Sequence, residues 1–173
     1  LKVVIPSNPY DAKGLLIQAI RDNDPVIFCE HKSLHQLEGD VPETPYAIPF
    51  NEANIVREGG DVTIVAIGFM VHRAMEAAGL LAKEGIQCEV IDPRTTSPMD
   101  LVTIIESVEN TGRLVVVDES NPRCSMAADI SAQVTEQAFG SLKGPVKMVT
   151  APHCPPPFSD CLLYTSPSPR DQS

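Results

Sequence analysis

Two aspartates, Asp22 and Asp24, follow a stretch in which apolar residues recur at helical spacing. The last carbonyl groups of a helix have no partners within the helix and carry partial negative charge. Two carboxylates beside such carbonyls form an oxygen-rich cluster, which is the kind of donor set that hard cations take. The same pattern is typical of a solvated acidic turn, and the residues alone leave both interpretations open.

A second set of charged side chains follows two strand-like runs. Asp92 and Arg94 come after the run Cys88–Ile91, and two carboxylates, Asp118 and Glu119, come after the next such run. Functional loops of a parallel sheet gather at the carboxyl ends of its strands, so these groups would share one edge. An aspartate–arginine pair can shape its turn, bind an anion or meet a partner subunit. Two carboxylates beside an arginine could also do acid–base chemistry, but no substrate pocket is visible in the sequence.

Histidines occur at four positions. His31 and His35 are four residues apart and could share a helix face as metal ligands, but no third ligand is evident near them. A pair of solvated loop histidines is the alternative. His72 suits a capping or packing role, and His153, which stands next to Cys154 among prolines, suits a loop.

Motifs and composition exclude several classes of protein. The chain has no dinucleotide fingerprint, phosphate-binding loop, HExxH or GxSxG motif, which limits what it can do alone. Its formal net charge of -10 would repel phosphates, so we expect neither nucleic acid nor an anionic membrane surface as a partner. No apolar run approaches the ~18 residues of a membrane-spanning helix. The five cysteines, without CxxC spacing, indicate reduced thiols in an intracellular protein.

Patterns near the start of the chain predict a strand, a helix and a second strand. The first strand, Lys2–Ile5, is followed by Asn8, which can cap a helix, and by Pro9, which suits the first helical position. The second strand is Val26–Phe28. The apolar residues at helical spacing between them are Leu15, Leu16, Ala19 and Ile20. The chain lacks an initiator methionine and its first strand has the pattern of a fold interior, so we expect a fragment.

From Asp61 onwards, apolar runs alternate with helical stripes, which predicts an α/β fold with a mostly parallel sheet and helices on both faces. For the helix expected after the strand Cys88–Ile91, Ser97 is the expected N-cap, Pro98 the first helical residue and Asp100 the capping-box residue. The last helix is expected over 127–139. The expected strands are Val62–Ile67, Cys88–Ile91, Leu114–Val117 and Val146–Val149.

Residues 33–60 show neither the pattern of the segment before them nor that of the segment after them. Pro42, Pro45 and Pro49 interrupt any regular element, and acidic residues add to the loop signal. We therefore expect an irregular crossover or linker between two α/β units. The tail after Phe158 is rich in serine and proline and is expected to be non-native or disordered.

Five segments carry a combination of motifs known from one enzyme family. They are VIPSNPYDAKGLLIQAIRDNDPVIFCEHK, EANIVREGGDVTIVAIGFMVHRAMEAA, CEVIDPRTTSPMD, GRLVVVDESNPRCSMAADI and APHCPPPF. Together they resemble the β subunit of the thiamine-dependent E1 component of 2-oxo acid dehydrogenase complexes, within its acetoin and pyruvate dehydrogenase branch. The resemblance covers about residues 1–159.

The resemblance implies two domains. Residues 1–50 would be the C-terminal part of a transketolase-like pyrimidine-binding domain, 51–60 a linker, 61–159 a transketolase C-terminal-like domain and 160–173 the tail. In this family, the glutamate that activates the cofactor and an active-site histidine lie upstream of Leu1. The resemblance therefore implies no catalytic or cofactor-binding residue in this chain, and no activity of the chain alone.

A structural potassium ion occurs in mitochondrial, pyruvate-type members of the family. It is held by backbone and side-chain oxygens of the segment that reads AIRDND here. The matching ligand positions are Ala19, Ile20, Asp22 and Asp24. Relatives usually have asparagine at the last position, so Asp24 departs from the pattern. The resemblance favours a cation site over the solvated acidic turn.

The resemblance also implies an activity. The intact heterotetramer would use thiamine diphosphate, with Mg2+ on the α subunit, to decarboxylate pyruvate oxidatively or cleave acetoin and to transfer the acyl group to lipoyl groups. The implied partners are the E1 α subunit, a second β subunit and dihydrolipoyl acyltransferase E2, in the bacterial cytoplasm or the mitochondrial matrix. Two alternatives stay open: part of a transketolase or 1-deoxyxylulose-5-phosphate synthase, and a non-catalytic interaction domain.

Overall fold

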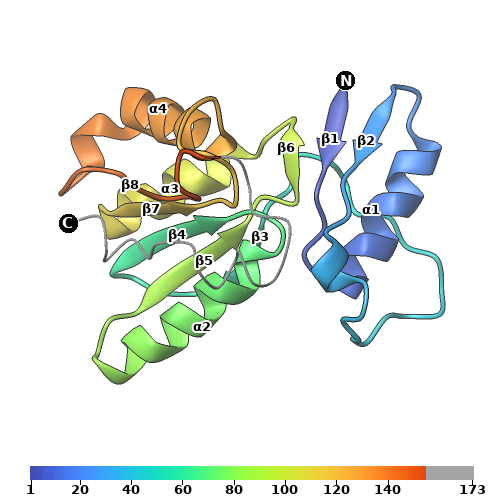
Figure 1. The fold of residues 1–173 in the computed structure, drawn as a ribbon, viewed down its shortest axis with the longest axis horizontal. Coiled ribbons are helices and arrows are strands. Elements are labelled where there is room, and N and C mark those ends of the chain that lie inside the picture. Colours follow the sequence, from blue (N-terminus) through green and yellow to red (C-terminus); the bar gives the residue numbers. More distant parts are fainter. Residues whose placement is uncertain (155–173) are drawn as a thin grey trace.

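The structure, a computed structural model, describes residues 1–154. The tail expected at 160–173, the end of the expected second domain and Cys161 lie outside the described residues. Within the described part, two sheets lie side by side (Figure 1). None of the described helices is long and apolar enough to cross a membrane.

The first sheet has three strands in the order β2-β1-β6. Strands β1 and β2 run parallel and are connected by α1, as expected for a β–α–β unit (Figure 1). Strand β6 comes from much later in the chain and pairs antiparallel with β1. The bounds are β1 Lys2–Val4, α1 Pro9–Arg21, β2 Val26–Phe28, the 3-10 helix η1 Lys32–Leu34 and β6 Thr95–Ser97.

The second sheet has five strands in the order β3-β5-β4-β7-β8, of which β3 alone is antiparallel to its neighbour. Its strands are β3 Asn54–Arg57, β4 Val62–Ala66, β5 Cys88–Asp92, β7 Leu114–Val117 and β8 Lys147–Val149. Its helices are α2 Met70–Lys83, α3 Leu101–Thr111 and α4 Met126–Ala138, with the 3-10 helix η2 Phe139–Ser141.

Helices cover both faces of this second sheet, with α2 on one side and α3 and α4 on the other (Figure 1). Alternate residues of the central strand β4 pack on opposite faces of the sheet. Val65 packs in the cluster with α3 and α4, whereas Ile64 and Ala66 pack in the cluster with α2. A strand buried on both faces needs the unbroken apolar run that β4 has. The α/β fold class is therefore confirmed.

Two strands lie where the sequence predicted none. Strand β3 falls within residues 33–60, which were expected to be irregular, and forms an antiparallel edge with a shifted register. Strand β6 has the sequence Thr-Thr-Ser and no apolar run. Both strands are short and are held by pairing with distant segments, so local periodicity does not indicate them.

The start of α3 differs from the predicted cap. Ser97 lies in β6, and the N-cap residue is Asp100, whose carboxylate accepts the Thr103 amide at 3.1 Å and the Thr103 hydroxyl at 2.6 Å. The Ala53 amide donates to the same carboxylate at 3.0 Å. Burial alone would raise the pKa of Asp100, but these hydrogen bonds outweigh it and lower the pKa. The ionised carboxylate therefore caps the helix and also holds the segment before β3.

The predicted apolar face of α1 is buried in part. Leu15 is fully buried and packs with Val4 and Ile48. Leu16 and Ile20, however, are 44 % and 75 % exposed. Only part of the apolar stripe therefore faces the core within the part of the chain that the structure describes.

Candidate functional site

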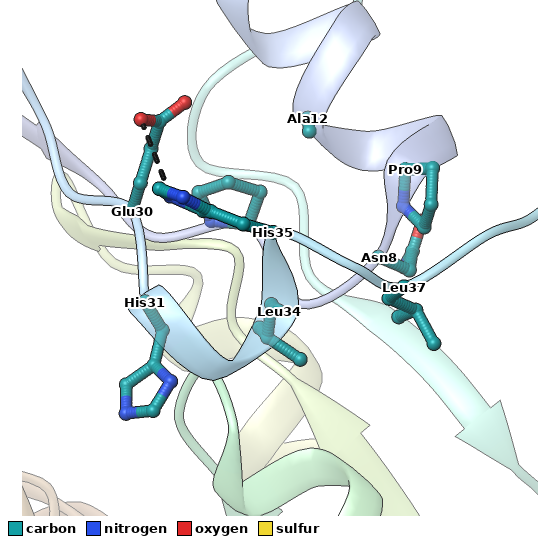
Figure 2. Close-up of a pocket in the computed structure, with 9 residues that line it drawn as sticks. Asn8, Pro9, Ala12, Glu30, His31, Leu34, His35 and Leu37 are labelled. Atoms are coloured by element: carbon teal, nitrogen blue, oxygen red, sulfur yellow. Dashed lines mark ion pairs between the residues drawn. The ribbon is translucent and has the colours of Figure 1, made fainter.

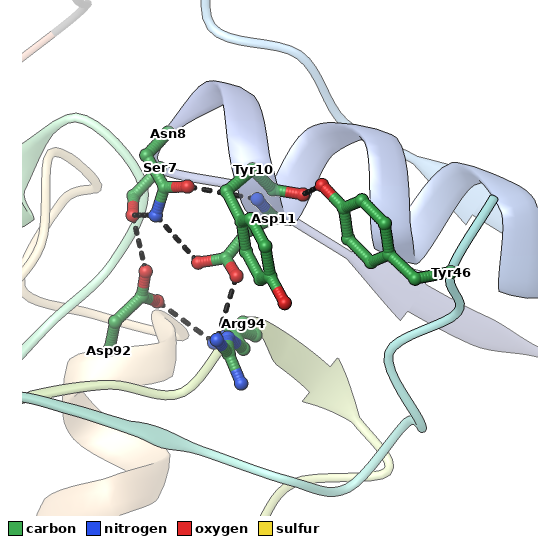
Figure 3. A network of polar contacts seen from close by, with 7 residues as sticks. All are labelled: Ser7, Asn8, Tyr10, Asp11, Tyr46, Asp92 and Arg94. Atoms are coloured by element: carbon green, nitrogen blue, oxygen red, sulfur yellow. Dashed lines mark hydrogen bonds and ion pairs between the residues drawn. The ribbon is translucent and has the colours of Figure 1, made fainter. Parts of the chain in front are cut away.

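The candidate site lies where the two sheets meet, at the turn between β5 and β6 (Figure 3). Because β6 pairs with β1, this turn brings Asp92 and Arg94 against the loop that connects β1 to α1. The Ile5 amide donates to the Arg94 carbonyl at 2.8 Å. Strands β1 and β5 both end here, and the carboxyl ends of parallel strands are where functional loops of α/β proteins gather.

Asp92 ends β5 and has no exposed surface. The Ser7 hydroxyl donates to its Oδ2 at 2.5 Å, and the Arg94 amide donates to its Oδ1 at 2.9 Å. Burial raises the pKa of Asp92 to about 6. The hydrogen bonds from Ser7 and the Arg94 amide oppose this rise, and the charge of Asp11 adds to it. Asp92 is therefore a buried acid that holds a residue of the first sheet's loop.

Arg94 reaches across the junction with its side chain. Its Nη2 lies 2.7 Å from Oδ1 of Asp11, and the two side chains are 12 % and 1 % exposed. The backbone of Arg94 has a φ of 59°, a left-handed conformation that costs free energy in a residue other than glycine. An ion pair between Asp92 and Arg94 was one expectation from the sequence. Instead, the Arg94 amide binds Asp92 while its guanidinium pairs with Asp11, so the turn is shaped by a backbone hydrogen bond.

Asp11 lies in the first turn of α1, where the helix dipole favours negative charge. The N-cap residue Asn8 accepts the Asp11 amide at 2.8 Å and donates from its Nδ2 to the Asp11 carboxylate at 2.6 Å. The predicted Asn8 cap is thus confirmed. Ser7 and Asp11 are 2 % and 1 % exposed, so their polar groups depend on protein partners and not on water.

A second contact between the first part of the chain and the second sheet lies beyond the end of β7. Oε2 of Glu119 lies 3.2 Å from Nε2 of His31. Asp118 accepts two backbone amides, at 3.0 Å and 3.3 Å, and so shapes the loop that leads into α4. Within residues 1–154, no ion pair connects either carboxylate to Arg94, so the acid–base cluster considered for this edge does not form.

The histidines have separate roles. Nε2 of His72 lies 2.8 Å from the Ser7 carbonyl, in keeping with the expected packing role. Nδ1 of His31 accepts the Ser33 amide at 3.2 Å, whereas His35 faces Glu30 at 3.8 Å. The pair four residues apart therefore does not converge on one point. Among the described residues, no group of three or more His, Cys, Asp or Glu side chains could hold a metal ion.

An open cavity of about 540 Å³ lies beside this network, at the carboxyl ends of β1 and β2 (Figure 2). Asn8, Pro9 and Ala12 line it from α1 and the loop before it. Leu34 and Leu37 line it from the segment after β2, together with the polar side chains of Glu30, His31 and His35. A cavity with both apolar and polar groups, at the ends of parallel strands, is a common position for a ligand site. The sequence did not indicate this cavity, because its walls come from two segments that the fold brings together.

The predicted cation site lies at the other end of α1. Both carboxylate oxygens of Asp22, the C-cap residue, lie 2.8 Å from Nζ of Lys2, and Asp24 lies 3.2 Å from the same nitrogen. The hydrogen bond from Lys2 lowers the pKa of Asp22. In this arrangement the two carboxylates face one positive charge, the ammonium group of Lys2. The other predicted donors are the main-chain carbonyls of Ala19 and Ile20, and the former accepts the Asp22 amide at 3.4 Å.

The raised pKa of Asp92 predicts a distinct pH dependence of stability. The folded state holds a proton on Asp92 up to about pH 6, whereas the ordinary value is 3.8. This contribution to stability is therefore full below about pH 4 and is lost as the pH rises to about 6, by on the order of 3 kcal/mol. Asp92→Asn cannot ionise, so its free energy of unfolding should rise relative to wild type over the same pH range, as measured by urea unfolding.

Other carboxylates act in the opposite direction. The lowered pKa values of Asp22 and Asp100 give stability that is lost as the pH falls, so the comparison must be the difference between Asp92→Asn and wild type. Asp61→Asn is the matched control, because Asp61 is exposed and accepts the Gln87 amide far from the junction. A difference between Asp92→Asn and wild type that does not change from pH 4 to 7 would contradict this account of Asp92.

Comparison with known families and proteins places both parts of the chain. Residues 51–171 match the transketolase C-terminal domain, and residues 1–37 match the transketolase pyrimidine binding domain. Over 162 residues the chain is 70 % identical to the acetoin:2,6-dichlorophenolindophenol oxidoreductase subunit beta of Cupriavidus necator, covering 94 % of this chain and 48 % of that protein. It is 49 % identical over 172 residues to the pyruvate dehydrogenase E1 component subunit beta of Bacillus subtilis, covering 99 % and 53 %.

A similar solved structure is described as a split gene transketolase, inactive beta4 tetramer. It has a TM-score of 0.78 and 26 % sequence identity, and the match covers 95 % of this chain and 52 % of that one. The chain spans about half the length of the curated relatives that it matches. The resemblance to E1 β subunits is therefore confirmed, and the chain belongs to the transketolase family, in which its relatives include the β subunits of acetoin- and pyruvate-oxidising enzymes.

Proposed function

We propose that this chain is part of the β subunit of a thiamine diphosphate-dependent E1 enzyme that acts on acetoin or pyruvate. The proposal rests on the 70 % identity to the acetoin oxidoreductase subunit beta, compared with 49 % for the pyruvate dehydrogenase relative. This difference favours acetoin. The 26 % identity to the split gene transketolase favours the E1 assignment over a transketolase, and the match to two enzyme domains favours an enzyme over a free-standing interaction domain.

In this proposal the cofactor supplies the reactive group, and this chain supplies part of the protein around it. Thiamine diphosphate, when bound, supplies the chemistry that cleaves the bond next to a carbonyl group, and the acyl group passes to lipoyl groups of E2. The chain has no phosphate-binding loop, and its described residues offer no three-membered metal cluster. We therefore assign the diphosphate and Mg2+ to the α subunit, and the reacting glutamate and histidine to a part of the β subunit outside this chain. The role of this chain is to form and hold one wall of the cavity beyond β1 and β2.

The proposed partners are an α subunit, a second β subunit and dihydrolipoyl acyltransferase E2. Large apolar side chains that stay exposed, Ile20 of α1 and Ile27 of β2 among them, support further contacts by these elements. The beta4 assembly named for the related solved structure supports contact between β subunits. The bacterial relatives favour the bacterial cytoplasm over the mitochondrial matrix as the compartment.

The activity can be tested with the complete β subunit produced together with its α subunit. With thiamine diphosphate and Mg2+, we expect reduction of 2,6-dichlorophenolindophenol that depends on acetoin and, at a lower kcat/KM, on pyruvate. Omitting the α subunit should abolish the reaction, because the diphosphate site would be missing. A complex that binds thiamine diphosphate but oxidises neither substrate, and instead transfers ketol groups between sugar phosphates, would contradict the E1 assignment.

We also propose a structural potassium site at the C-terminal end of α1, with oxygens of Ala19, Ile20, Asp22 and Asp24 as ligands. A carbonyl oxygen has two lone pairs, so the Ala19 carbonyl, which accepts the Asp22 amide at 3.4 Å, can also bind a cation, as can the Ile20 carbonyl in the last turn of α1. The ammonium group of Lys2 lies 2.8 Å from the Asp22 carboxylate and therefore competes with any cation there.

This competition gives the potassium proposal a specific test. Lys2→Met should increase the amount by which potassium chloride raises the Tm of the β subunit relative to sodium chloride at equal concentration, because it frees both carboxylates. Lys83→Met, which removes a lysine at the end of α2, should leave that amount unchanged. Equal Tm values in the two salts for wild type and for Lys2→Met would rule out the site.

A further inference from the structure

We propose that the turn 92–94 is a positioning element that holds the loop between β1 and α1 and thereby sets the shape of the cavity in Figure 2. The second sheet would then control ligand binding at the first sheet, through Asp92 and Arg94. The inference rests on the proposed function, since it takes the ligand of the cavity to be the small carbonyl substrate or the cofactor of the E1 reaction.

The turn 92–94 binds the segment between β1 and α1 at two points. Asp92 accepts the hydroxyl of Ser7, and Arg94 pairs with Asp11 at 2.7 Å, as Figure 3 shows. Asn8 and Pro9, which lie between these two points, line the cavity. Any shift of the turn is therefore passed to the cavity wall through both ends of a short segment.

Burial makes these contacts hard to replace. Asp92 is fully buried, Asp11 is 1 % exposed and Ser7 is 2 % exposed, so water cannot take over their hydrogen bonds. A buried carboxylate that loses its cationic partner is strongly destabilised. If Arg94 is removed, the loop must therefore move until Asp11 reaches water. Such a movement would widen or close the cavity beside it.

The conformation of Arg94 fits a positioning role. Its φ of 59° is uncommon in residues other than glycine, and strained backbone of this kind persists where surrounding contacts determine it. Here the surrounding contacts are the Arg94 amide on Asp92, the Arg94 carbonyl on the Ile5 amide, and the guanidinium on Asp11. The first contact shapes the turn itself, and the other two fix the turn relative to the end of β1 and the start of α1.

The contact between the turn 92–94 and the loop before α1 should also depend on pH. Asp92 faces the Ser7 hydroxyl from the first sheet, the Arg94 amide and guanidinium from its own turn, and the nearby Asp11 carboxylate of α1. His72 of α2 contacts the carbonyl of the same Ser7. When Asp92 takes up a proton, it can donate to the Ser7 oxygen where it previously accepted, so the position of Ser7 should depend on pH near 6.

The first experiment uses the complete β subunit assembled with its α subunit. Arg94→Met should raise KM for acetoin by about tenfold while kcat per active site changes by less than about threefold, because the cavity wall moves but the reacting groups do not. Arg94→Lys should recover part of the loss. Asp92→Asn should remove the change in KM that wild type shows between pH 5 and about 7.

Two control variants carry similar substitutions at the opposite, amino-terminal end of the second sheet. Arg113→Met removes an exposed hydrogen bond from the Arg113 side chain to the Asp61 carbonyl. Asp61→Asn removes the negative charge of an exposed side chain that accepts the Gln87 amide. Both should keep wild-type KM values and pH profiles. If Arg94→Met lowers the Tm yet keeps the wild-type KM, or if Asp92→Asn keeps the wild-type pH profile, the positioning role is overturned.

A second experiment separates this inference from the proposed function. Amide hydrogen exchange of residues 6–12 in the β subunit requires no activity. Arg94→Met should speed exchange there by at least about tenfold while β4 and β7 exchange as in wild type. Unchanged exchange in residues 6–12 would overturn the positioning role even in an active enzyme. Faster exchange in a complex that oxidises neither acetoin nor pyruvate would support it while refuting the E1 assignment.

Discussion

The buried ion pair between Arg94 and Asp11 is the contact on which the arrangement of the two sheets most depends. Removing one partner of such a pair costs about 3–5 kcal/mol, because the remaining charge is left without compensation. The pair brings the turn after β5 to the first turn of α1, at 2.7 Å, with both side chains nearly inaccessible to water. The pairing of β6 with β1 follows directly after this turn and extends the same junction.

The distribution of charge at the junction explains why its two aspartates behave differently. Asp11 takes the guanidinium of Arg94 and the amide group of Asn8. Among residues 1–154, Asp92 receives two hydrogen bonds and no ion pair, so burial prevails and its pKa rises to about 6. One aspartate thus anchors the loop by charge, and the other anchors it by a hydrogen bond that can reverse with protonation.

Features with local causes could be predicted from the sequence, and features that depend on distant partners could not. The apolar run of β4 and the Asn8 cap are local and were confirmed. The sequence indicated Arg94 as a candidate but could not identify Asp11 as its partner, since Asp11 lies far away in the sequence, in the helix beside the first sheet. The predicted cap of α3 was wrong because Ser97 lies in β6, a strand that forms by pairing with the distant strand β1, and the helix therefore begins later, with Asp100 as its N-cap.

The most direct test of the central claim is a double-mutant cycle on Arg94 and Asp11. The free energies of unfolding of wild type, Arg94→Met, Asp11→Asn and the double variant would be measured by urea denaturation at pH 7. A buried pair that joins the two sheets predicts a coupling energy of at least about 1 kcal/mol, with the double variant less destabilised than the sum of the single variants. Additive effects, with no coupling beyond experimental error, would show that the junction does not depend on this ion pair.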